Sequence, residues 1–176
     1  MLVVISDTHA TEGHGLAGRT LEAVREAALV VHAGDFTTTA AYEAHREAAP
    51  DLLAVHGNAD EPALRQRLPA ARTVAALGLR IAVTHRRDGG ATGLAMFGRS
   101  RGADVVVSGH THRPSVTDAG DVLLVNPGSH ARPRGNRPGH AELRRADGGV
   151  VGELREPDGT LVDSFRVDPS AGSGPG

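Results

Sequence analysis

Polar residues of the metal-binding type follow five short apolar runs of the chain. The runs end in SDTH, HAGD, GNAD, VTH and SGHTH, and the ligand-type residues in them are Asp7, His9, Asp35, Asn58, His85, His110 and His112. In an open α/β sheet, ligands bind beyond the carboxyl ends of the strands, so these side chains converge if the runs are neighbouring parallel strands. The alternation within Asp7/His9 and within His110/His112 predicts that both members of each pair lie on one side of an extended segment.

Nitrogen and oxygen donors of this kind predict a catalytic rather than a structural metal site. The chain has no cysteine, which excludes a thiolate zinc site, and the donors suit Mn, Fe, Ni or Zn, with Mn as the expected ion. The candidate ligands outnumber the three or four that one catalytic ion takes from protein, which favours two divalent ions roughly 3.5 to 4 Å apart. Asp35 is the expected bridging ligand, because its strand lies between those that carry Asp7 and Asn58.

The elements that must position these residues follow from the hydrophobic pattern. Short runs that are apolar on both faces predict buried strands. They lie at Leu2–Ile5, Leu29–Val31, Leu52–Val55, Ile81–Val83 and Val105–Val107. Ala-rich stretches over Ala17–Ala28 and Thr38–Ala49 separate the first three runs and predict helices, so the chain opens as a βαβαβ unit of an α/β protein.

The second half of the chain predicts a different arrangement. A hairpin is expected to turn near Gly78, and a helix is expected over Gly90–Gly102. Turn signals at Ala119-Gly120, Asp147-Gly148 and Asp158-Gly159 predict that an antiparallel half closes the fold. We expect one domain over residues 1–167, followed by a disordered tail over residues 168–176 that is rich in Gly, Ser and Pro.

The composition excludes several classes of function. The chain of 176 residues has 19 arginines, no lysine and 21 acidic residues, so it lacks the charge of a dedicated nucleic-acid binder, and nucleic acid is expected only as a possible substrate. Four aromatic residues are too few for a base-stacking platform. No signal peptide or membrane span is apparent, which predicts a cytoplasmic protein that does not bind membranes. The oligomeric state stays open, a dimer included.

The other histidines are weaker candidates. His14 follows the first strand at the expected rim of the site and is a possible proton donor, and His130 is a weaker candidate of the same kind. His32 and His56 precede ligands closely, so each is either a satisfied core residue or a hydrogen-bond partner of a ligand. His45 is expected on a helix surface.

A competing motif is GHGLAG, Gly13–Gly18, which has the form of a dinucleotide-binding fingerprint, with Asp35 placed as the ribose-binding acid. A phosphate-binding turn needs its first glycine directly after the strand, whereas Gly13 lies well beyond Ile5. This alternative also leaves the histidine ligands unexplained.

Taken together and in order, SDTH, HAGD, GNAD, TH, SGHTHRP and NPGS closely resemble the motifs of the small bacterial and archaeal calcineurin-like metallophosphoesterases, across about residues 1–167. The resemblance implies two stacked mixed β-sheets flanked by helices. It implies that Asp7, His9, Asp35 and His112 hold one metal, and that Asp35, Asn58, His85 and His110 hold the other. It also implies hydrolysis of a small phosphoester by a hydroxide that bridges the metals.

Three positions differ from residues found in relatives. Arg86 and Arg87 stand where relatives commonly have Gly-His, and together with Arg113 they are candidates for binding phosphate through guanidinium forks, the alternative being solvent-facing charges. Ala59 stands where larger relatives carry a histidine that protonates the leaving group. The charges favour a phosphodiester, because two divalent ions with Asp7 and Asp35 leave two positive charges for a hydroxide and a diester anion. The main alternative function is a non-catalytic protein-binding scaffold, as in retromer-subunit relatives of the same fold.

Overall fold

The computed structural model describes residues 1–168 and arranges its strands in two mixed sheets. The six-stranded sheet has the order β11-β10-β9-β1-β2-β3. Its strands are β1 (Leu2–Ile5), β2 (Leu29–His32), β3 (Leu52–Ala54), β9 (His140–Ala146), β10 (Gly149–Arg155) and β11 (Leu161–Val167). The five-stranded sheet has the order β4-β5-β6-β8-β7. Its strands are β4 (Ala71–Ala76), β5 (Leu79–Thr84), β6 (Val105–Val107), β7 (Ser115–Asp118) and β8 (Leu123–Asn126).

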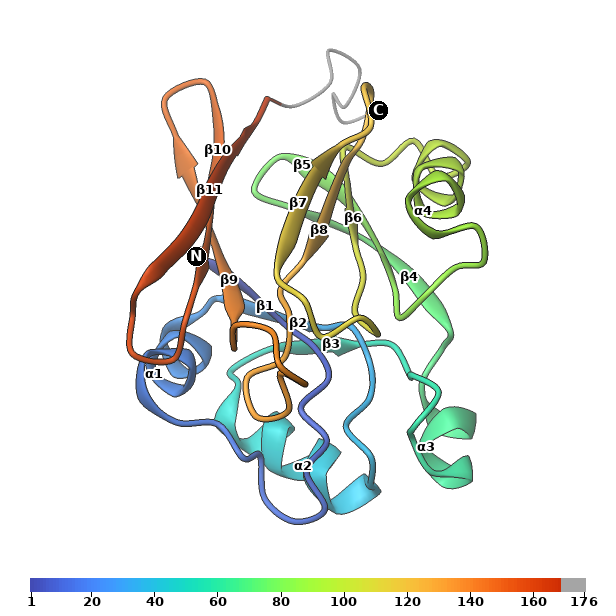
Figure 1. Ribbon diagram of the computed structural model, residues 1–176, viewed down its shortest axis with the longest axis vertical. Coiled ribbons are helices and arrows are strands. Elements are labelled where there is room, and N and C mark those ends of the chain that lie inside the picture. Colours follow the sequence, from blue (N-terminus) through green and yellow to red (C-terminus); the bar gives the residue numbers. More distant parts are fainter. Residues whose placement is uncertain (169–176) are drawn as a thin grey trace.

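The main hydrophobic core lies between the two sheets, which stack on each other (Figure 1). It combines Val4 and Val31 of the first sheet with Ile81, Val105 and Val125 of the second. These β-branched side chains come from the apolar runs of the sequence, which are buried because both faces of their strands are covered. The predicted two-sheet α/β fold is therefore confirmed.

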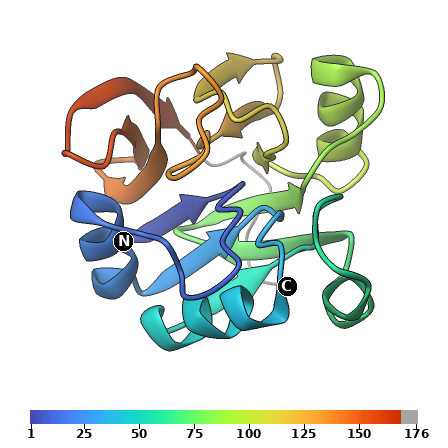
Figure 2. The ribbon, with the colours of Figure 1, turned by 60° about the horizontal axis from the view of Figure 1, so that its bottom comes forward.

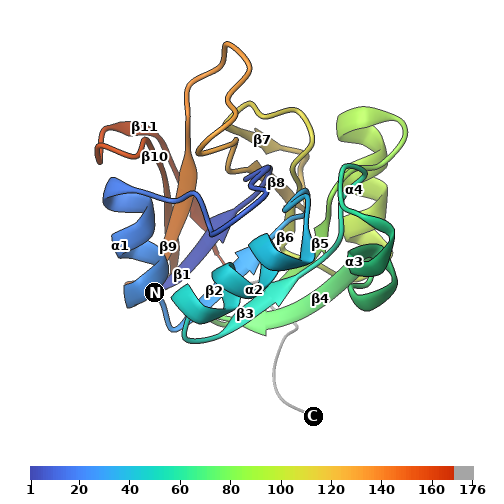
Figure 3. The ribbon, with the colours of Figure 1, turned by 90° about the horizontal axis from the view of Figure 1, so that it is seen from below.

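Helices cover the outer faces of this sandwich. The first sheet is covered by α1 (Gly18–Glu26) and α2 (Thr39–Ala48), and the second by α4 (Gly90–Arg99). Figures 2 and 3 show α1 and α2 together and α4 on the other side of the molecule. The Thr38 hydroxyl accepts a hydrogen bond from the amide of Ala41, 3.1 Å away, and caps α2. No helix among residues 1–168 is long and apolar enough to cross a membrane.

Several predicted elements differ from those observed. The short helix α3 (Pro62–Arg67) is not among the predicted helices, because six residues give too little periodicity to recognise. The helix expected to reach Gly102 ends at Arg99. The predicted disordered tail lies, apart from Asp168, outside the described residues.

The strands after Arg113 do not form an antiparallel half of their own. β9 pairs antiparallel with β1 and extends the first sheet, whereas β8 pairs parallel with β6 in the second. The predicted hairpin turns are nonetheless present, between β4 and β5, β7 and β8, β9 and β10, and β10 and β11. The turn signals therefore located the hairpins but could not assign them to a sheet.

Candidate metal centre

The candidate ligands lie in loops that follow strands of both sheets. Asp7, His9, Asp35 and Asn58 follow β1, β2 and β3, which run parallel to one another. His85, His110 and His112 follow β5 and β6, which are parallel neighbours in the second sheet. The site is thus assembled where the carboxyl ends of two stacked sheets meet.

The backbone that carries the ligands is not extended, contrary to the alternation expected from the sequence. Asp7, His9, Asp35, His110 and His112 all have left-handed backbone conformations, with φ between 45° and 72°. A residue with a side chain rarely adopts this conformation, which costs about 1 kcal/mol or more and persists where the surroundings enforce it. The prediction that an extended segment aligns each pair is therefore wrong, and tight turns after the strands do so instead.

The two buried carboxylates are held by backbone amides. The amide of His110 donates to the Asp7 carboxylate at 2.9 Å, and the amide of Ala59 donates to Oδ1 of Asp35 at 2.8 Å. Glycines allow these approaches, because a Cβ atom at Gly57 would lie 2.0 Å from Oδ1 of Asp35, and one at Gly109 would lie 2.6 Å from Oδ2 of Asp7. The glycines of GNAD and SGHTH therefore make room for the carboxylates of the neighbouring loops.

The histidine rings are oriented by carbonyl groups on their far side. Nδ1 of His85 donates to the carbonyl of Ala33 at 2.8 Å, and Nδ1 of His112 donates to the carbonyl of Arg132. In each neutral ring this leaves Nε2 as an acceptor that faces the carboxylates. This is the ring orientation that metal-binding histidines adopt.

Acceptors consequently face acceptors across the centre of the site. Nε2 of His85 lies 3.3 Å from Oδ2 of Asp35 and has no hydrogen-bond partner, although it is buried. Nε2 of His112 lies 3.4 Å from Oδ1 of Asp7, and 3.3 Å from Nε2 of His9, which donates to it in one tautomer of the His9 ring. Lone pairs that face one another without a donor are unfavourable unless a cation lies between them, so the donor set fits a metal.

The pKa values of the buried groups also indicate that the site lacks positive charge. Burial raises the pKa of Asp7. Burial also favours the neutral forms of Asp35 and His85, but the attraction between the carboxylate and a protonated His85 ring outweighs it, so the pKa of Asp35 is lowered and that of His85 is raised. A proton on Nε2 of His85 is therefore the alternative to a metal cation between the two groups. A divalent ion would supply the positive charge that these carboxylates lack.

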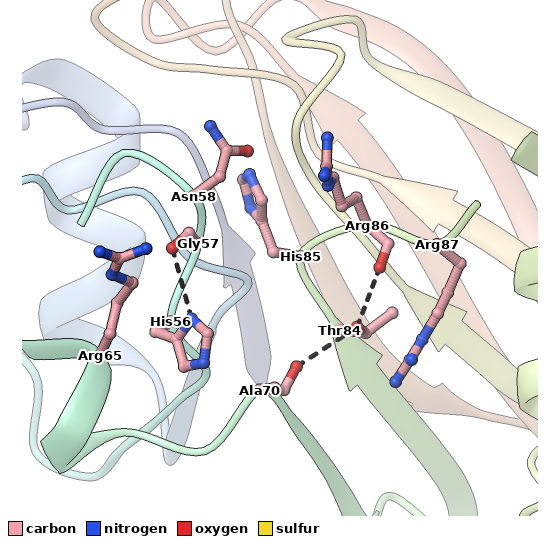
Figure 4. A pocket seen from close by; sticks show the side chains of 9 residues that line it. All are labelled: His56, Gly57, Asn58, Arg65, Ala70, Thr84, His85, Arg86 and Arg87. Carbon is pink, nitrogen blue, oxygen red and sulfur yellow. Dashed lines mark hydrogen bonds between the residues drawn. The ribbon is translucent and has the colours of Figure 1, made fainter. Parts of the chain in front are cut away.

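The ligand atoms form two overlapping groups, within each of which they lie no more than 4.8 Å apart: Asp7 with His9 and His112, and Asp7 with Asp35 and His85. Asp7 belongs to both groups. The ring of His110 lies beside the second group, 5.3 Å from the ring of His85. Asn58 is exposed and lies next to His85 (Figure 4).

Further residues brace the ligand loops. Asp60 is buried and accepts hydrogen bonds from the amides of Asp35, Gly57 and Thr37 at 3.2, 2.7 and 2.7 Å. In NPGS, Asn126 donates to the carbonyl of Gly109 at 2.8 Å, and Ser129 donates to the carbonyl of Asp7 at 2.6 Å. The sequence singled out NPGS only as a motif, and the structure shows that it fastens the SDTH loop to the SGHTH loop.

Other histidines have local partners. Nδ1 of His14 accepts from the amide of Leu16 at 3.0 Å, and Nε2 of His130 accepts from the amide of Ala17 at 3.2 Å. His32 is buried against Phe36, and its Nδ1 accepts from the amide of Gly34. His56 lies half-buried in the wall of a cavity beside the centre.

The expected surface position of His45 is wrong. Its side chain is only 1% exposed and lies on the inner face of α2, where Nδ1 donates to the carbonyl of Ala41 and the ring packs edge-on against Phe36. Ala41 and Tyr42 share this face, so His45 replaces an apolar residue in the helical period.

The three arginines predicted to bind phosphate differ in position. Arg86 and Arg87 point in opposite directions, and the guanidinium of Arg87 lies over the ring of Phe97, 4.2 Å from its centroid (Figure 4). Arg113 is exposed directly after His112. Arg86 is exposed beside His85 and is the best placed of the three for contact with a bound anion.

The GHGLAG segment does not form a phosphate-binding turn. Seven residues separate the end of β1 from the first glycine, and only Gly18 of the segment lies in α1. The carbonyl of Pro157 covers the start of this helix: it accepts from the amide of Arg19 at 2.7 Å, and it would lie 2.3 Å from a Cβ at Gly18. A pyrophosphate could not reach the helix amides there.

Comparison with known proteins assigns the family. Residues 1–147 match the calcineurin-like phosphoesterase superfamily domain. The chain belongs to this superfamily. It is 32% identical over 148 residues to a probable metallophosphoesterase of Methanothermobacter thermautotrophicus, covering 82% of this chain and 85% of that protein. It is 28% identical over 128 residues to the phosphodiesterase YfcE of Escherichia coli, covering 70% and 67% of the two chains.

Solved structures share the fold of this superfamily member at lower identity. Vps29 of Entamoeba histolytica, solved in complex with zinc, superimposes with a TM-score of 0.75 at 23% identity, over 95% of this chain and 98% of that one. An archaeal phosphodiesterase superimposes with a TM-score of 0.62 at 20% identity, over 94% and 98%.

Proposed function

We propose that the protein is a binuclear metal-dependent phosphodiesterase. The observation that carries the proposal is the set of acceptors that face one another in the metal centre, where imidazole nitrogens lie 3.3 to 3.4 Å from the carboxylates of Asp7 and Asp35. Retaining such a set without a cation would cost stability and would bring no structural gain.

The proposed ligand sets are Asp7, His9, Asp35 and His112 for one ion, and Asp35, Asn58, His85 and His110 for the other. Asp7 belongs to both groups of nearby ligand atoms, so its negative charge would stabilise both ions when they are bound. Mn²⁺ is the proposed ion, with Fe, Ni and Zn as alternatives that suit the same donors. When bound, two such ions would polarise a phosphoester and make a water nucleophilic at neutral pH.

The residues of the chain supply positioning and charge. Asp60 and Ser129 hold the ligand loops, while Arg86 and Arg113 offer guanidinium groups to anionic groups of the substrate. Ala59 provides only its amide, which holds Asp35, so no imidazole is available at that position to protonate a leaving group. We therefore expect a preference for diesters with good leaving groups.

A protein-binding scaffold is the second candidate, because Vps29 structures share the fold. Fold similarity at this level of identity does not determine function. The aspartate and histidine groups of the metal centre favour hydrolysis over a purely structural role.

The test is hydrolysis by protein loaded with Mn²⁺, with bis(p-nitrophenyl) phosphate and p-nitrophenyl phosphate compared under equal conditions. We expect faster turnover of the diester, and no turnover by Asp35→Asn, while Asp121→Asn retains full activity because Asp121 is exposed and pairs with Arg99. The absence of turnover with Mn, Fe, Ni and Zn alike would contradict the proposal.

A further inference from the structure

A cavity of about 230 Å³ adjoins the metal centre on the side of β3 and β5. The candidate ligands Asn58 and His85 form one end of it, and His56 and Thr84 form part of its wall. Figure 4 shows Arg65 of α3 on one side of this space and Arg86 on the other. A group attached to a phosphoester at the metal centre could therefore extend directly into the cavity.

The charged side chains that line this cavity are all positive. Arg65, Arg86 and Arg87 line it, and none of its described lining residues is an aspartate or glutamate. A neighbour on α3 shows the contrast, because Arg67 pairs with Glu43 and its guanidinium lies 4.9 Å from the ring centroid of Tyr42. Within residues 1–168, Arg65 and Arg86 form no ion pair with a carboxylate.

Unpaired guanidinium groups on two sides of a cavity fit an anion with several oxygens. Each planar group can donate two parallel hydrogen bonds to a phosphate, and such charge-assisted bonds are stronger than neutral ones. The two positive charges left at a loaded metal centre are taken up by a hydroxide and the diester, so a second anionic group needs cations of its own. Arg65 and Arg86 provide them.

We propose that this cavity binds a second phosphoryl group of the substrate, held by Arg65 and Arg86. The substrate class is then a phosphodiester in which one ester group carries a further phosphate, as in a nucleotide with a terminal phosphate. This inference rests on the proposed function, because it places the reacting diester at the metal centre.

The test uses two diesters that differ by one phosphate: thymidine 5′-(p-nitrophenyl phosphate), and the same compound with a 3′-phosphate. In Mn²⁺-loaded protein we expect kcat/KM to be roughly tenfold higher or more for the phosphorylated compound, from charge-assisted hydrogen bonds to the added phosphate. In Arg65→Gln and Arg86→Gln this preference should fall to near one. Both side chains are exposed, so neither change should disturb folding.

The matched control is Arg67→Gln, which removes the same charge from the same helix and should keep the preference. Calorimetric binding of thymidine 3′,5′-bisphosphate and of thymidine 5′-monophosphate gives a second readout that needs no turnover. Tighter binding of the bisphosphate that depends on Arg65 supports the cavity even if the enzyme proposal fails. The inference would be overturned if kcat/KM of the wild type were equal for the two diesters, or if the preference persisted in Arg65→Gln and Arg86→Gln. Neither result would contradict the proposed diesterase function.

Discussion

Two groups of buried polar side chains in this protein satisfy their hydrogen bonds in opposite ways. The Glu142 network comprises Arg19 and Thr20 of α1, His130, and His140 and Glu142 of β9. In this network every donor meets an acceptor. The amide of Ala17 donates to His130, which bonds to Thr20 at 3.1 Å, Thr20 bonds to His140 at 3.0 Å, and His140 bonds to Glu142 at 3.1 Å.

The charge of this network is balanced within the protein as well. Arg19 donates two parallel hydrogen bonds to the Glu142 carboxylate, at 2.7 and 2.8 Å. The hydrogen bonds from His140 and Arg19 lower the pKa of Glu142 against the effect of burial. The metal cluster, Asp7, His9, Asp35, His85 and His112, has no such cation, and its acceptors face one another. Buried histidines and carboxylates alone do not mark a functional site, and neither does a single unpaired acceptor, since Nε2 of His45 is also buried without a partner. The metal cluster is marked by imidazole nitrogens and carboxylates that face one another.

The largest expected difference between the two groups is in turnover. Asp7→Asn keeps the shape of the side chain and an oxygen that can accept from the His110 amide, but it removes a charge that belongs to both ligand groups. We expect diester hydrolysis to fall by about a thousandfold or more, roughly 4 kcal/mol of transition-state stabilisation. The free energy of unfolding of the metal-free protein should stay constant or rise, because a desolvated carboxylate is lost.

Steady-state kinetics and urea unfolding of the same preparation measure both quantities. If the metal-free Asp7→Asn protein were markedly less stable than the metal-free wild type, the metal cluster would be a structural network like the Glu142 network.

The reverse pattern is expected for Glu142→Gln. The change removes the negative charge that pairs with Arg19 and replaces one of the two acceptor oxygens with an NH2 donor, so we expect a loss of about 3 kcal/mol in the free energy of unfolding. Turnover at a temperature where the variant is folded should remain within about twofold of the wild type. Asp163→Asn, an exposed carboxylate on β11, is the control for stability. A stable but inactive Glu142→Gln protein would contradict the separation of the two groups.

His45 is a buried histidine that belongs to neither group, and it should contribute to the pH dependence of stability. Burial lowers the pKa of His45 to about 4 from its usual 6.5. The unfolded chain therefore binds more protons than the folded protein between these values, and stability falls as the pH drops through that window. Between pH 7.5 and pH 5 we expect His45 to account for about 1 to 2 kcal/mol of lost stability.

Urea unfolding of the wild type and of His45→Leu at both pH values measures this contribution as the difference between their pH dependences. If the free energy of unfolding depended on pH equally in the two proteins, His45 would not change its protonation on unfolding.

The smallest effect concerns Ala59 at the exposed edge of the metal centre. An imidazole introduced by Ala59→His could protonate a departing alkoxide or phenoxide, so we expect about a tenfold gain on diphenyl phosphate, whose leaving group is poor. Bis(p-nitrophenyl) phosphate, whose leaving group needs no proton, should show little change. Ala59→Phe controls for bulk, and an equal gain in that variant would rule out proton donation.

The sequence predicted the ligand types and their convergence, because apolar runs that end in Asp and His are visible without tertiary information. It could not predict that His85 and His110 reach the site from a second sheet, since pairing between distant strands leaves no local signal. Nor could it predict the left-handed turns at Asp7 and Asp35, which the surrounding loops enforce against local preference. The Glu142 network and the burial of His45 were missed for a similar reason, because a polar residue that packs inside the fold looks like a surface residue in a sequence.

The central claim is that the imidazole nitrogens and carboxylates that face one another in the metal cluster are ligands of two divalent ions. Titration of the metal-free protein with Mn²⁺ by isothermal titration calorimetry tests this claim most directly. We expect two ions bound per chain in the wild type and in Glu142→Gln, and the loss of at least one of them in Asp7→Asn. Fewer than two ions in the wild type, or unchanged binding in Asp7→Asn, would contradict it.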